Sequence, residues 1–436
     1  MYRWGNGYSY NFREDLVFLQ FAYLFYRRTH EVPPIPHAMA RDTDVSIRGD
    51  SLKDKNVLFA ITGGIAATES VKISRELRRY GANITMIMTK EAEKIITPLA
   101  VSWASDTSVI TGWSYEMSQL EDYDAILVAP ATRNTISKHI HGIMDTPLMM
   151  ALSAARAKQT PTLFVPSMHQ DLFDDPVTSE LLQKLNYDGC FTMIDTVREN
   201  KIKQPKPIQI VAKLSNIINS KLNNRKKIAI TLGANRAPID SVRAIQNASS
   251  GKTGWIISEY LYRNGHDVVC IVGKTTEKPN FEMPDIRLAG SPDEMLHESI
   301  NLASEEQKPD AWIHAAAVLD YYTEPEEGKR PSEQGDWEMT LTQGPKHIAK
   351  LMPLVGNSIR IGFKLESNVK EEILIEKANK QIMRYNLDAV IANMKEQIHD
   401  SNFPRARIVN KDGTVRILSN YEELCEAIES VIIRPR

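Results

Sequence analysis

The sequence predicts an α/β protein made of two Rossmann-like, three-layer domains, each with a mostly parallel sheet. Two observations predict this class. Each half of the chain begins with a short apolar run that leads into a glycine turn and then a helical stretch, which is the βαβ pattern of doubly wound folds. The 436 residues are also enough for two domains, with a boundary expected near residue 223.

The first half opens with the apolar residues 56–61, which are typical of a buried parallel strand. A turn at 62–64 follows, and residues 66–80 then form a helical pattern that Gly81 ends. Residues 84–88 are expected to be the next strand. Because a glycine turn that opens a helix presents backbone N–H groups to a phosphate, this turn is a candidate binding site.

The second half repeats this plan. We expect a strand over 227–231, a glycine turn, a helix over 254–263 and a further strand over 268–272. Between the halves, residues 198–226 are rich in Lys, Pro and Asn, which favours a linker that contains a short helix near 210–218.

The composition is that of an ordinary soluble protein, with 42% hydrophobic residues, 25% charged residues and a net charge of −2. This balance gives no electrostatic reason to expect nucleic acid or a membrane surface as a partner. Cys190, Cys270 and Cys425 are far apart and form no CxxC pair. They therefore predict neither a zinc site nor a disulfide framework, and a reducing, cytoplasmic compartment is expected.

Residues 1–50 are expected to be an N-terminal extension of unknown role. The apolar stretch at 16–26 is too short to span a bilayer. Acidic residues precede it and arginines follow it, which is the opposite of a secretory signal. We interpret the stretch as a packing arm or an amphipathic segment.

The stretch QNASSGKTGW, residues 246–255, contains the GKT that ends the phosphate-binding loop of many ATPases. That loop needs a glycine five positions before Gly251, and Gln246 stands there instead. The stretch is therefore not that loop.

Three motifs of the first half fall where strands should end: TGGIAA at 62–67, APATRNT at 129–135 and PSMH at 166–169. In this order and spacing they resemble the flavin-dependent cysteine decarboxylase domain of coenzyme A biosynthesis, and archaeal members most of all. The resemblance covers roughly residues 51–220. It implies a flavodoxin-like, FMN-binding domain that spans residues 51–222 with its linker.

The resemblance also implies roles for single residues. Asn134 would hold the substrate carboxylate by its amide. The FMN contacts would come from Gly63, Gly64, Ile65, Thr89, Pro130, Ala131 and Thr132. If the resemblance were discounted, the two glycines would only form a tight turn between strand and helix.

The first half departs from this family at its catalytic histidine. The aligned position falls on Glu116 or Met117, and no histidine lies between residues 112 and 124. Three histidines elsewhere could substitute, with His169 the preferred candidate, whereas His139 and His141 are expected at a surface or subunit contact. Cys190 is expected to be inert packing, and residues 199–203 occupy the place of the archaeal EGKAK. We therefore predict weak or no decarboxylation.

Residues 231–254, TLGANRAPIDSVRAIQNASSGKTG, look like the signature TxGGTxExIDxVRxIxNxSSGKMG of phosphopantothenate–cysteine ligase. HAAAVLDY at 314–321, IGFKLE at 361–366 and residues 386–393 continue the resemblance, which implies a ligase domain at 223–436. Asn247 would contact an acyl intermediate, and Lys329 would act in catalysis and bind nucleotide. The other implied nucleotide contacts are Ser249, Ser250, Gly251, Lys252, Asp320, Gly344, Pro345, Phe363 and Lys380.

The ligase half departs from its family in its charges. Lys346 replaces an aspartate after Gly344-Pro345, and Gln381 and Tyr385 replace two lysines. Neighbouring cations, Lys377, Lys380 and Arg384, could supply the missing charge. The choice between ATP and CTP stays open.

Together the two resemblances imply a bifunctional enzyme that ligates 4′-phosphopantothenate to cysteine with CTP or ATP and then decarboxylates the product. FMN and Mg²⁺ are the expected cofactors. A homo-oligomer is expected, with trimeric contacts in the flavoprotein half and dimeric contacts in the ligase half. Two alternatives remain: an FMN-binding regulatory or scaffold protein that does not decarboxylate, and a ligase that carries a relic flavoprotein domain.

Overall fold

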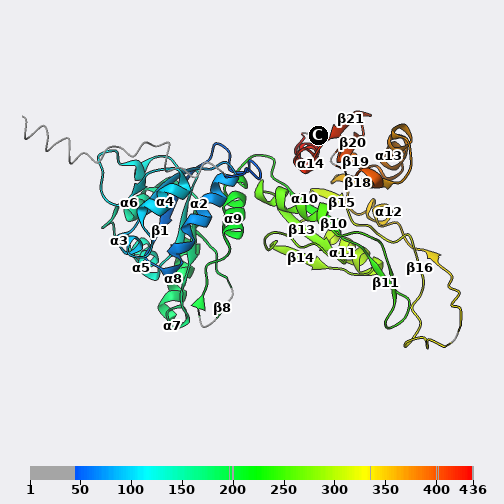
Figure 1. The fold of residues 1–436 in the computed structure, drawn as a ribbon, viewed down its shortest axis with the longest axis horizontal. Coiled ribbons are helices and arrows are strands. Elements are labelled where there is room, and N and C mark those ends of the chain that lie inside the picture. Colours follow the sequence, from blue (N-terminus) through cyan, green and yellow to red (C-terminus); the bar gives the residue numbers. More distant parts are fainter. Residues whose placement is uncertain are drawn as a thin grey trace, which may run out of the picture.

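The computed structural model describes residues 45–434 except Thr196, Glu199, Asn200, Gln334, His399 and Ser401. Most of the extension predicted at 1–50 therefore lies outside the described residues. The described chain forms two bodies, each built around its own sheet (Figure 1). Within this part, no helix combines the length and the apolar character that crossing a membrane requires.

The first sheet has six strands in the order β3-β2-β1-β4-β5-β7, and every pair is parallel. This confirms the doubly wound class, and the order is that of the Rossmann fold rather than of flavodoxin. The strands are β1 (Asn56–Ile61), β2 (Asn83–Met88), β3 (Val109–Ile110), β4 (Ala125–Ala131), β5 (Thr162–Pro166) and β7 (Phe191–Thr192).

Helices cover both faces of this sheet, because strands buried on two sides need an apolar layer on each. One face packs against α2 (Ser70–Arg79), α4 (Pro98–Ser105) and α9 (Pro207–Asn219). The other packs against α5 (Arg133–Ile140), α6 (Pro147–Lys158) and α8 (Pro176–Tyr187). Shorter elements are η1 (Ile65–Glu69), α3 (Lys90–Glu93), η2 (Ser118–Leu120), β6 (Met168–His169), α7 (Gln170–Phe173), β8 (Val197–Arg198) and β9 (Lys201–Ile202).

Helix α9 confirms the helix predicted near 210–218, but it is longer than predicted and is packed in the core instead of lying in a linker. Ile210, Leu214 and Ile217 are buried in the core of the first sheet, while Ala212 belongs to the core of the second. On its second-domain side, the Asn216 side chain donates to the carbonyl of Tyr262 (2.8 Å). The helix therefore belongs to the packed body and joins the two domains side by side (Figure 1).

The second sheet has eight strands in the order β14-β13-β10-β15-β18-β19-β20-β21, and all pairs are parallel except those of β20. The strands are β10 (Lys227–Leu232), β13 (Asp267–Val272), β14 (Asp285–Leu288), β15 (Ala311–His314), β18 (Ile359–Glu366), β19 (Ala389–Met394), β20 (Ala406–Asn410) and β21 (Val415–Leu418).

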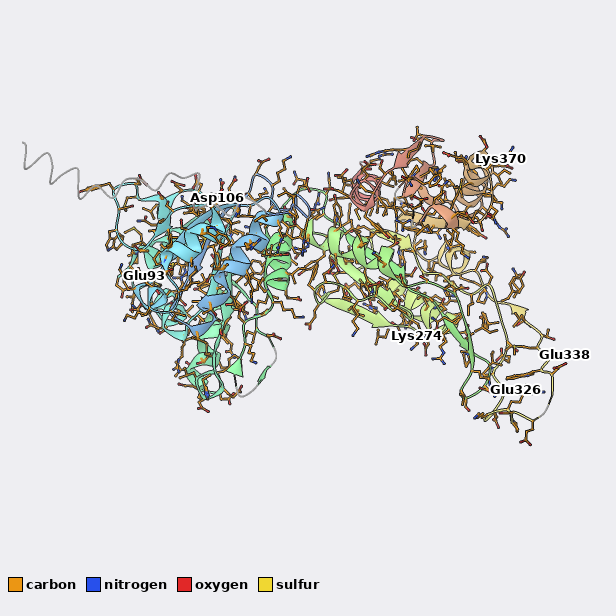
Figure 2. All side chains as sticks on the ribbon, in the orientation of Figure 1. Glu93, Asp106, Lys274, Glu326, Glu338 and Lys370 are labelled. Carbon is orange, nitrogen blue, oxygen red and sulfur yellow. The ribbon has the colours of Figure 1, made fainter. Side chains whose placement is uncertain are left out.

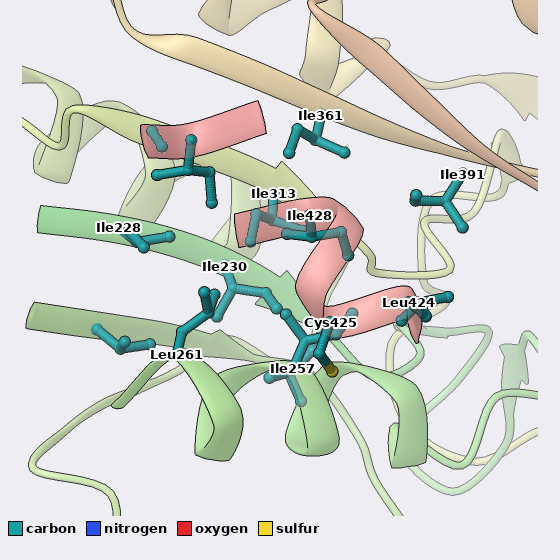
Figure 3. Packing of buried hydrophobic residues seen from close by; sticks show 14 of the residues in the cluster. Ile228, Ile230, Ile257, Leu261, Ile313, Ile361, Ile391, Leu424, Cys425 and Ile428 are labelled. Carbon is teal, nitrogen blue, oxygen red and sulfur yellow. The ribbon is translucent and has the colours of Figure 1, made fainter. Parts of the chain in front are cut away.

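The larger core of this domain lies between the sheet and two helices, α10 (Lys252–Arg263) and α14 (Tyr421–Ile433). Figure 3 shows Ile257 and Leu261 of α10 and Leu424 and Ile428 of α14 meeting the isoleucines of the central strands. The opposite face is covered by α11 (Pro292–Ser304), α12 (His347–Leu351) and α13 (Glu371–Tyr385). Beyond β19 a 3₁₀ turn, η3, spans Lys395–Gln397.

Two thin ribbons project from the second sheet, and we call residues 236–246 and 321–343 the arm (Figure 1). The first ribbon pairs β11 (Arg236–Pro238) with β12 (Ala244–Gln246), and the second pairs β16 (Tyr321–Tyr322) with β17 (Thr342–Gln343). The N–H of Ser241 donates to the carbonyl of Gly328 (3.0 Å), so the two ribbons hold each other. Glu326 and Glu338 mark their far end (Figure 2).

Candidate active sites at the two sheet edges

The motifs of the first half meet at the carboxyl edge of its sheet, where ligands bind in open α/β folds. Thr62 lies at the end of β1 and connects two of the motif turns. Its hydroxyl donates to the carbonyl of Pro130 (2.7 Å) and accepts from the N–H of Thr132 (3.0 Å). The TGG turn and the APAT turn are therefore one rigid unit.

Gly63 in the first turn lets α3 pack closely against the end of β1. A Cβ on Gly63 would lie 2.3 Å from the Cβ of Glu91, so no side chain fits there. The N–H of Gly63 has no acceptor among the described residues. Ile65 follows with 76% of its surface exposed. A free N–H next to an exposed apolar side chain suits a ligand that carries both a phosphate and a flat ring.

Two threonines at this edge begin helices. Thr89 caps α3 by accepting from the N–H of Ala92 (3.3 Å), and Thr132 caps α5 by accepting from the N–H of Thr135 (3.4 Å). A capping hydroxyl uses its oxygen as the acceptor and keeps its hydrogen for another partner. Thr89 can therefore still donate to an anion at this edge.

Asn134 and His169 come from neighbouring strand ends. Asn134 is exposed in the first turn of α5, after β4. His169 follows β5, is half-exposed, and has its Nδ1 3.1 Å from a carboxylate oxygen of Asp171. Both side chains lie at the rim of the edge, where a bound molecule can reach them.

The loop that should carry the family histidine is open to solvent. Glu116 and Met117 are both exposed between β3 and η2. Neither side chain is therefore buried in a pocket of the first domain. Glu199 and Asn200, at the EGKAK position, lie outside the described residues.

His139 corrects the expectation of a surface histidine. Its side chain is buried, and its ring packs against Phe164 with centroids 5.3 Å apart. Burial, with a contribution from Arg156, lowers the pKa of His139 to about 4. Cys190 lies beside it, with Sγ 3.8 Å from Nε2, and burial raises the pKa of that thiol to about 11. This pair is inert packing, whereas His141 is exposed.

The SSGK turn of the second half begins α10 at the carboxyl edge of the second sheet. Gly251 has a φ of 82°, and a Cβ there would lie 2.5 Å from the Cγ2 of Thr275. The N–H of Lys252 donates to the hydroxyl of Ser250 (3.3 Å), and the carbonyl of Ser250 accepts from the N–H of Thr276 (3.2 Å). The turn is therefore fixed by the Ser250 side chain and by the loop at Thr276, and it leads directly into a helix N-terminus, which favours anions.

Asn247 connects this turn to the next strand of the sheet. Its Nδ2 donates to the carbonyl of Ala317 (3.0 Å), just beyond β15. This bond holds the amide between the end of the hairpin β11–β12 and the end of β15. The Asn247 carbonyl oxygen is thereby oriented at the sheet edge.

Asp320, Gly344 and Pro345 lie together at the base of the arm. The N–H of Gly344 donates to the carbonyl of Asp320 (2.9 Å), and a Cβ on Gly344 would clash with Tyr322 at 2.3 Å. Lys346 forms an ion pair with the Asp320 carboxylate (2.6 Å). The lysine that replaces the family aspartate therefore neutralises the aspartate that the sequence assigns to the nucleotide.

The remaining sequence candidates are more dispersed. Phe363 is half-buried on β18, and its carbonyl accepts from the side chain of Gln381 (3.4 Å). Lys380 is exposed and paired with Glu376 (2.5 Å) within α13. Lys329 is exposed on the arm, and among the described residues no hydrogen bond joins its side chain to the SSGK turn.

Sequence reasoning missed Arg405, which is buried beside the first turn of α10. Its Nη2 donates to the hydroxyl of Thr253 (2.8 Å). The available signal was a charged residue immediately before the apolar strand β20, but its partner lies 152 positions away in the chain.

Two known domain families match this chain. The Flavoprotein family matches residues 45–232, and the family described as DNA/pantothenate metabolism flavoprotein C-terminal domain matches residues 223–432. The coenzyme A biosynthesis bifunctional protein CoaBC of Thermococcus kodakarensis is 35% identical over 349 residues, which are 78% of this chain and 86% of that protein. The CoaBC protein of Methanocaldococcus jannaschii is 30% identical over 382 residues, 86% of this chain and 93% of that protein.

Solved structures also resemble parts of the chain. The crystal structure of the DNA/pantothenate metabolism flavoprotein from Streptococcus pneumoniae is 27% identical, covers 48% of this chain and 98% of its own, and gives a TM-score of 0.43.

Proposed function

Because the chain belongs to the family of coenzyme A biosynthesis bifunctional proteins, we propose that it converts 4′-phosphopantothenate and cysteine into 4′-phosphopantetheine in two steps. The observation that carries this proposal is the presence of both domains in one chain, each with its motifs gathered at the carboxyl edge of its sheet. We assign the ligase to residues 223–436 and the flavin-dependent decarboxylase to residues 51–222.

The ligase step needs an activated carboxylate, because a free carboxylate is a poor electrophile. A carboxylate oxygen of 4′-phosphopantothenate attacks the α-phosphorus of the nucleotide, and pyrophosphate leaves. The cysteine amine then attacks the acyl carbon, and the nucleoside monophosphate leaves. The turn from Ser249 to Lys252 holds phosphate oxygens, Asn247 holds the acyl group, and Lys329 offsets the charge that develops at the α-phosphate.

The remaining nucleotide contacts are proposed at the base of the arm and on the neighbouring strand. Asp320, Gly344 and Pro345 line one side, and Phe363 stacks on the base, while Lys380 reaches the site after its pair with Glu376 opens. Mg²⁺ is proposed as the companion of the triphosphate, since it is commonly held by one or two carboxylates together with substrate phosphates.

The decarboxylase step takes place at the first sheet edge. The free N–H of Gly63, the hydroxyl of Thr89 and the exposed Ile65 fit FMN as a ligand. When bound, FMN would take up two electrons from the cysteine moiety so that its carboxylate can leave as CO₂, and would then return them, so that the thiol product forms without net oxidation. In the protein, Gly64 and residues 130–132 orient the ligand, Asn134 holds the substrate carboxylate, and His169 is positioned to move a proton.

A second candidate function is favoured by the loop at Glu116 and Met117. No histidine of this loop is available, and both side chains face solvent. The first domain would then bind FMN without decarboxylating, as a regulatory or scaffold part beside an active ligase. We also propose, from the resemblance to the same family, that the protein is a homo-oligomer. Its flavoprotein half would make trimeric contacts and its ligase half dimeric contacts, and the protein would be located in the cytoplasm.

The two candidates are separated by experiments on the purified full-length chain. Absorbance near the flavin bands, before and after reconstitution with FMN, tests whether the first domain binds FMN. A colourless protein that takes up no FMN would end both candidates for this domain and leave a ligase with a relic domain. Release of CO₂ from phosphopantothenoylcysteine by the yellow protein supports the decarboxylase, and FMN binding without CO₂ supports the second candidate.

A further inference from the structure

Arg405 is a buried arginine whose guanidinium is only partly satisfied. The residue is 8% exposed. Its Nη2 donates to the hydroxyls of Thr253 (2.8 Å) and Tyr421 (3.2 Å), and its guanidinium carbon lies 4.6 Å from the centre of the Tyr421 ring. Its Nε and Nη1 are buried and have no hydrogen-bond partner among the described residues.

The surroundings of Arg405 favour an anion that the protein itself does not supply. Thr253 belongs to the first turn of α10, the positive end of a twelve-residue helix, and this turn contains no acidic residue. A guanidinium at such an end is repelled rather than stabilised. Burying a cation without a counter-charge costs free energy, so an arrangement of this kind suits a site that an anionic ligand completes.

Arg407 shows what a structural arginine looks like on the same strand. It is 3% exposed, and each of its three guanidinium nitrogens donates a hydrogen bond. Its Nε and Nη2 donate to the carboxylate of Glu371 (3.3 and 3.1 Å), and its Nη1 donates to Gln397 (2.6 Å). Two residues away, Arg405 has no carboxylate partner in the described part of the chain. The two arginines are similarly buried, and they differ in whether a counter-charge is present.

The ligase half also needs a cation near its phosphates. Gln381 and Tyr385 stand where the resemblance expects lysines, and the nearby Lys377 and Lys380 are paired with glutamates. The guanidinium of Arg405 is held by the hydroxyls of Thr253 and Tyr421. A fixed guanidinium therefore lies beside the helix end to which the SSGK turn leads.

We propose that Arg405 binds a phosphate group of the nucleoside triphosphate at the first turn of α10, and so replaces charge that the family carries on α13. This inference rests on the proposed ligase function. The Arg405 guanidinium, whose Nε and Nη1 have no partner among the described residues, supplies the positive charge that attracts the phosphate, while the Thr253 and Tyr421 hydroxyls hold it. Arginine suits this task because its donors are rigid and its charge is permanent.

The test compares Arg405→Met with Arg407→Met in the full-length protein. Calorimetric titration with ATP, CTP and inorganic tripolyphosphate, each with Mg²⁺, gives the affinities, and thermal unfolding without ligand gives the stability. A lost charge-assisted contact should weaken binding of all three probes by about 10- to 100-fold in Arg405→Met. Its ligand-free unfolding temperature should not fall, because an unpaired charge has been removed. The affinities of Arg405→Lys for the three probes should lie between those of wild type and Arg405→Met.

Arg407→Met is the control, because Arg407 is a buried arginine on the same strand with a carboxylate partner. Arg407→Met should lower the ligand-free unfolding temperature and keep the affinities. Unchanged affinity in Arg405→Met, a loss confined to one nucleotide, or an equal loss in Arg407→Met would each overturn the phosphate assignment. A wild-type protein that binds none of the three probes would remove the ligase function and this inference together, whereas retained binding in Arg405→Met removes the inference alone.

Discussion

His347 should make the stability of the second domain fall steeply between pH 7.5 and pH 5. It begins α12 directly after Lys346, and its side chain is buried with both ring nitrogens lacking a hydrogen-bond partner among the described residues. Burial lowers its pKa to about 4; Asp293 and Asp320 act in the opposite direction, and Lys346 adds to the lowering. The neutral imidazole is therefore the form that the fold accepts.

The expected size of the effect follows from the two protonation states. An unfolded histidine has a pKa of about 6.5, so the unfolded chain binds a proton at a higher pH than the folded chain does. Stability is fully present above about pH 6.5 and is lost as the pH falls toward 4. At pH 5 the loss amounts to about 2 kcal/mol relative to pH 7.5. His347→Leu removes this loss.

Hydrogen exchange measures the effect in the right domain. The slowest amides of β15 and β18 report the free energy of opening this part of the chain. After correction for intrinsic exchange rates, wild type should lose about 2 kcal/mol more than His347→Leu between pH 7.5 and pH 5. His297→Leu, an exposed control on α11, should behave as wild type. If wild type and His347→Leu lose the same free energy of opening between pH 7.5 and pH 5, His347 is not the group responsible.

Three further predictions concern activity. Lys329→Gln should lower the rate of pyrophosphate release by about 10²–10³-fold. Because the side chain is exposed, the free energy of unfolding should change by less than about 0.5 kcal/mol. Release at the wild-type rate would contradict the role of Lys329, and Lys308→Gln, which changes another exposed lysine, is the control. Asn247→Asp should let the acyl-nucleotide accumulate, seen by mass spectrometry, and rapid onward reaction would contradict this. The unmodified protein should release CO₂ about 10²–10⁴-fold more slowly than a family member that has the catalytic histidine. Glu116→His or Met117→His should raise this rate. Rapid CO₂ release by the wild-type protein would contradict the prediction.

The parts of the fold that could be predicted are those with local signals. The apolar runs at β1 and β10 and the glycine turns that follow them mark strand, turn and helix without reference to distant residues. The strand bounds moved by at most one position, and α10 begins at Lys252, two positions before the prediction. The first predicted helix differs more, because residues 65–69 form the 3₁₀ helix η1 and α2 begins only at Ser70. Short-range chemistry of this kind is readable from a single chain.

The errors occurred where long-range packing decides. The polar residues at both ends of 198–226 indicated a linker, although α9 between them has an apolar face. That face is buried because the two domains meet there. His139 lies three positions after the buried Ile136, so its helical spacing already placed it on the inner face of α5. Arg405 had no comparable local signal, because its role depends on Thr253, far away in the chain.

The central claim is that this chain ligates 4′-phosphopantothenate to cysteine. The most direct measurement is mass spectrometry of the products formed by the full-length protein from 4′-phosphopantothenate, cysteine and Mg²⁺ with either CTP or ATP. We expect phosphopantothenoylcysteine together with pyrophosphate and the nucleoside monophosphate, with at least one of the two nucleotides and only when both other substrates are present. Absence of the ligated product with both nucleotides would contradict it.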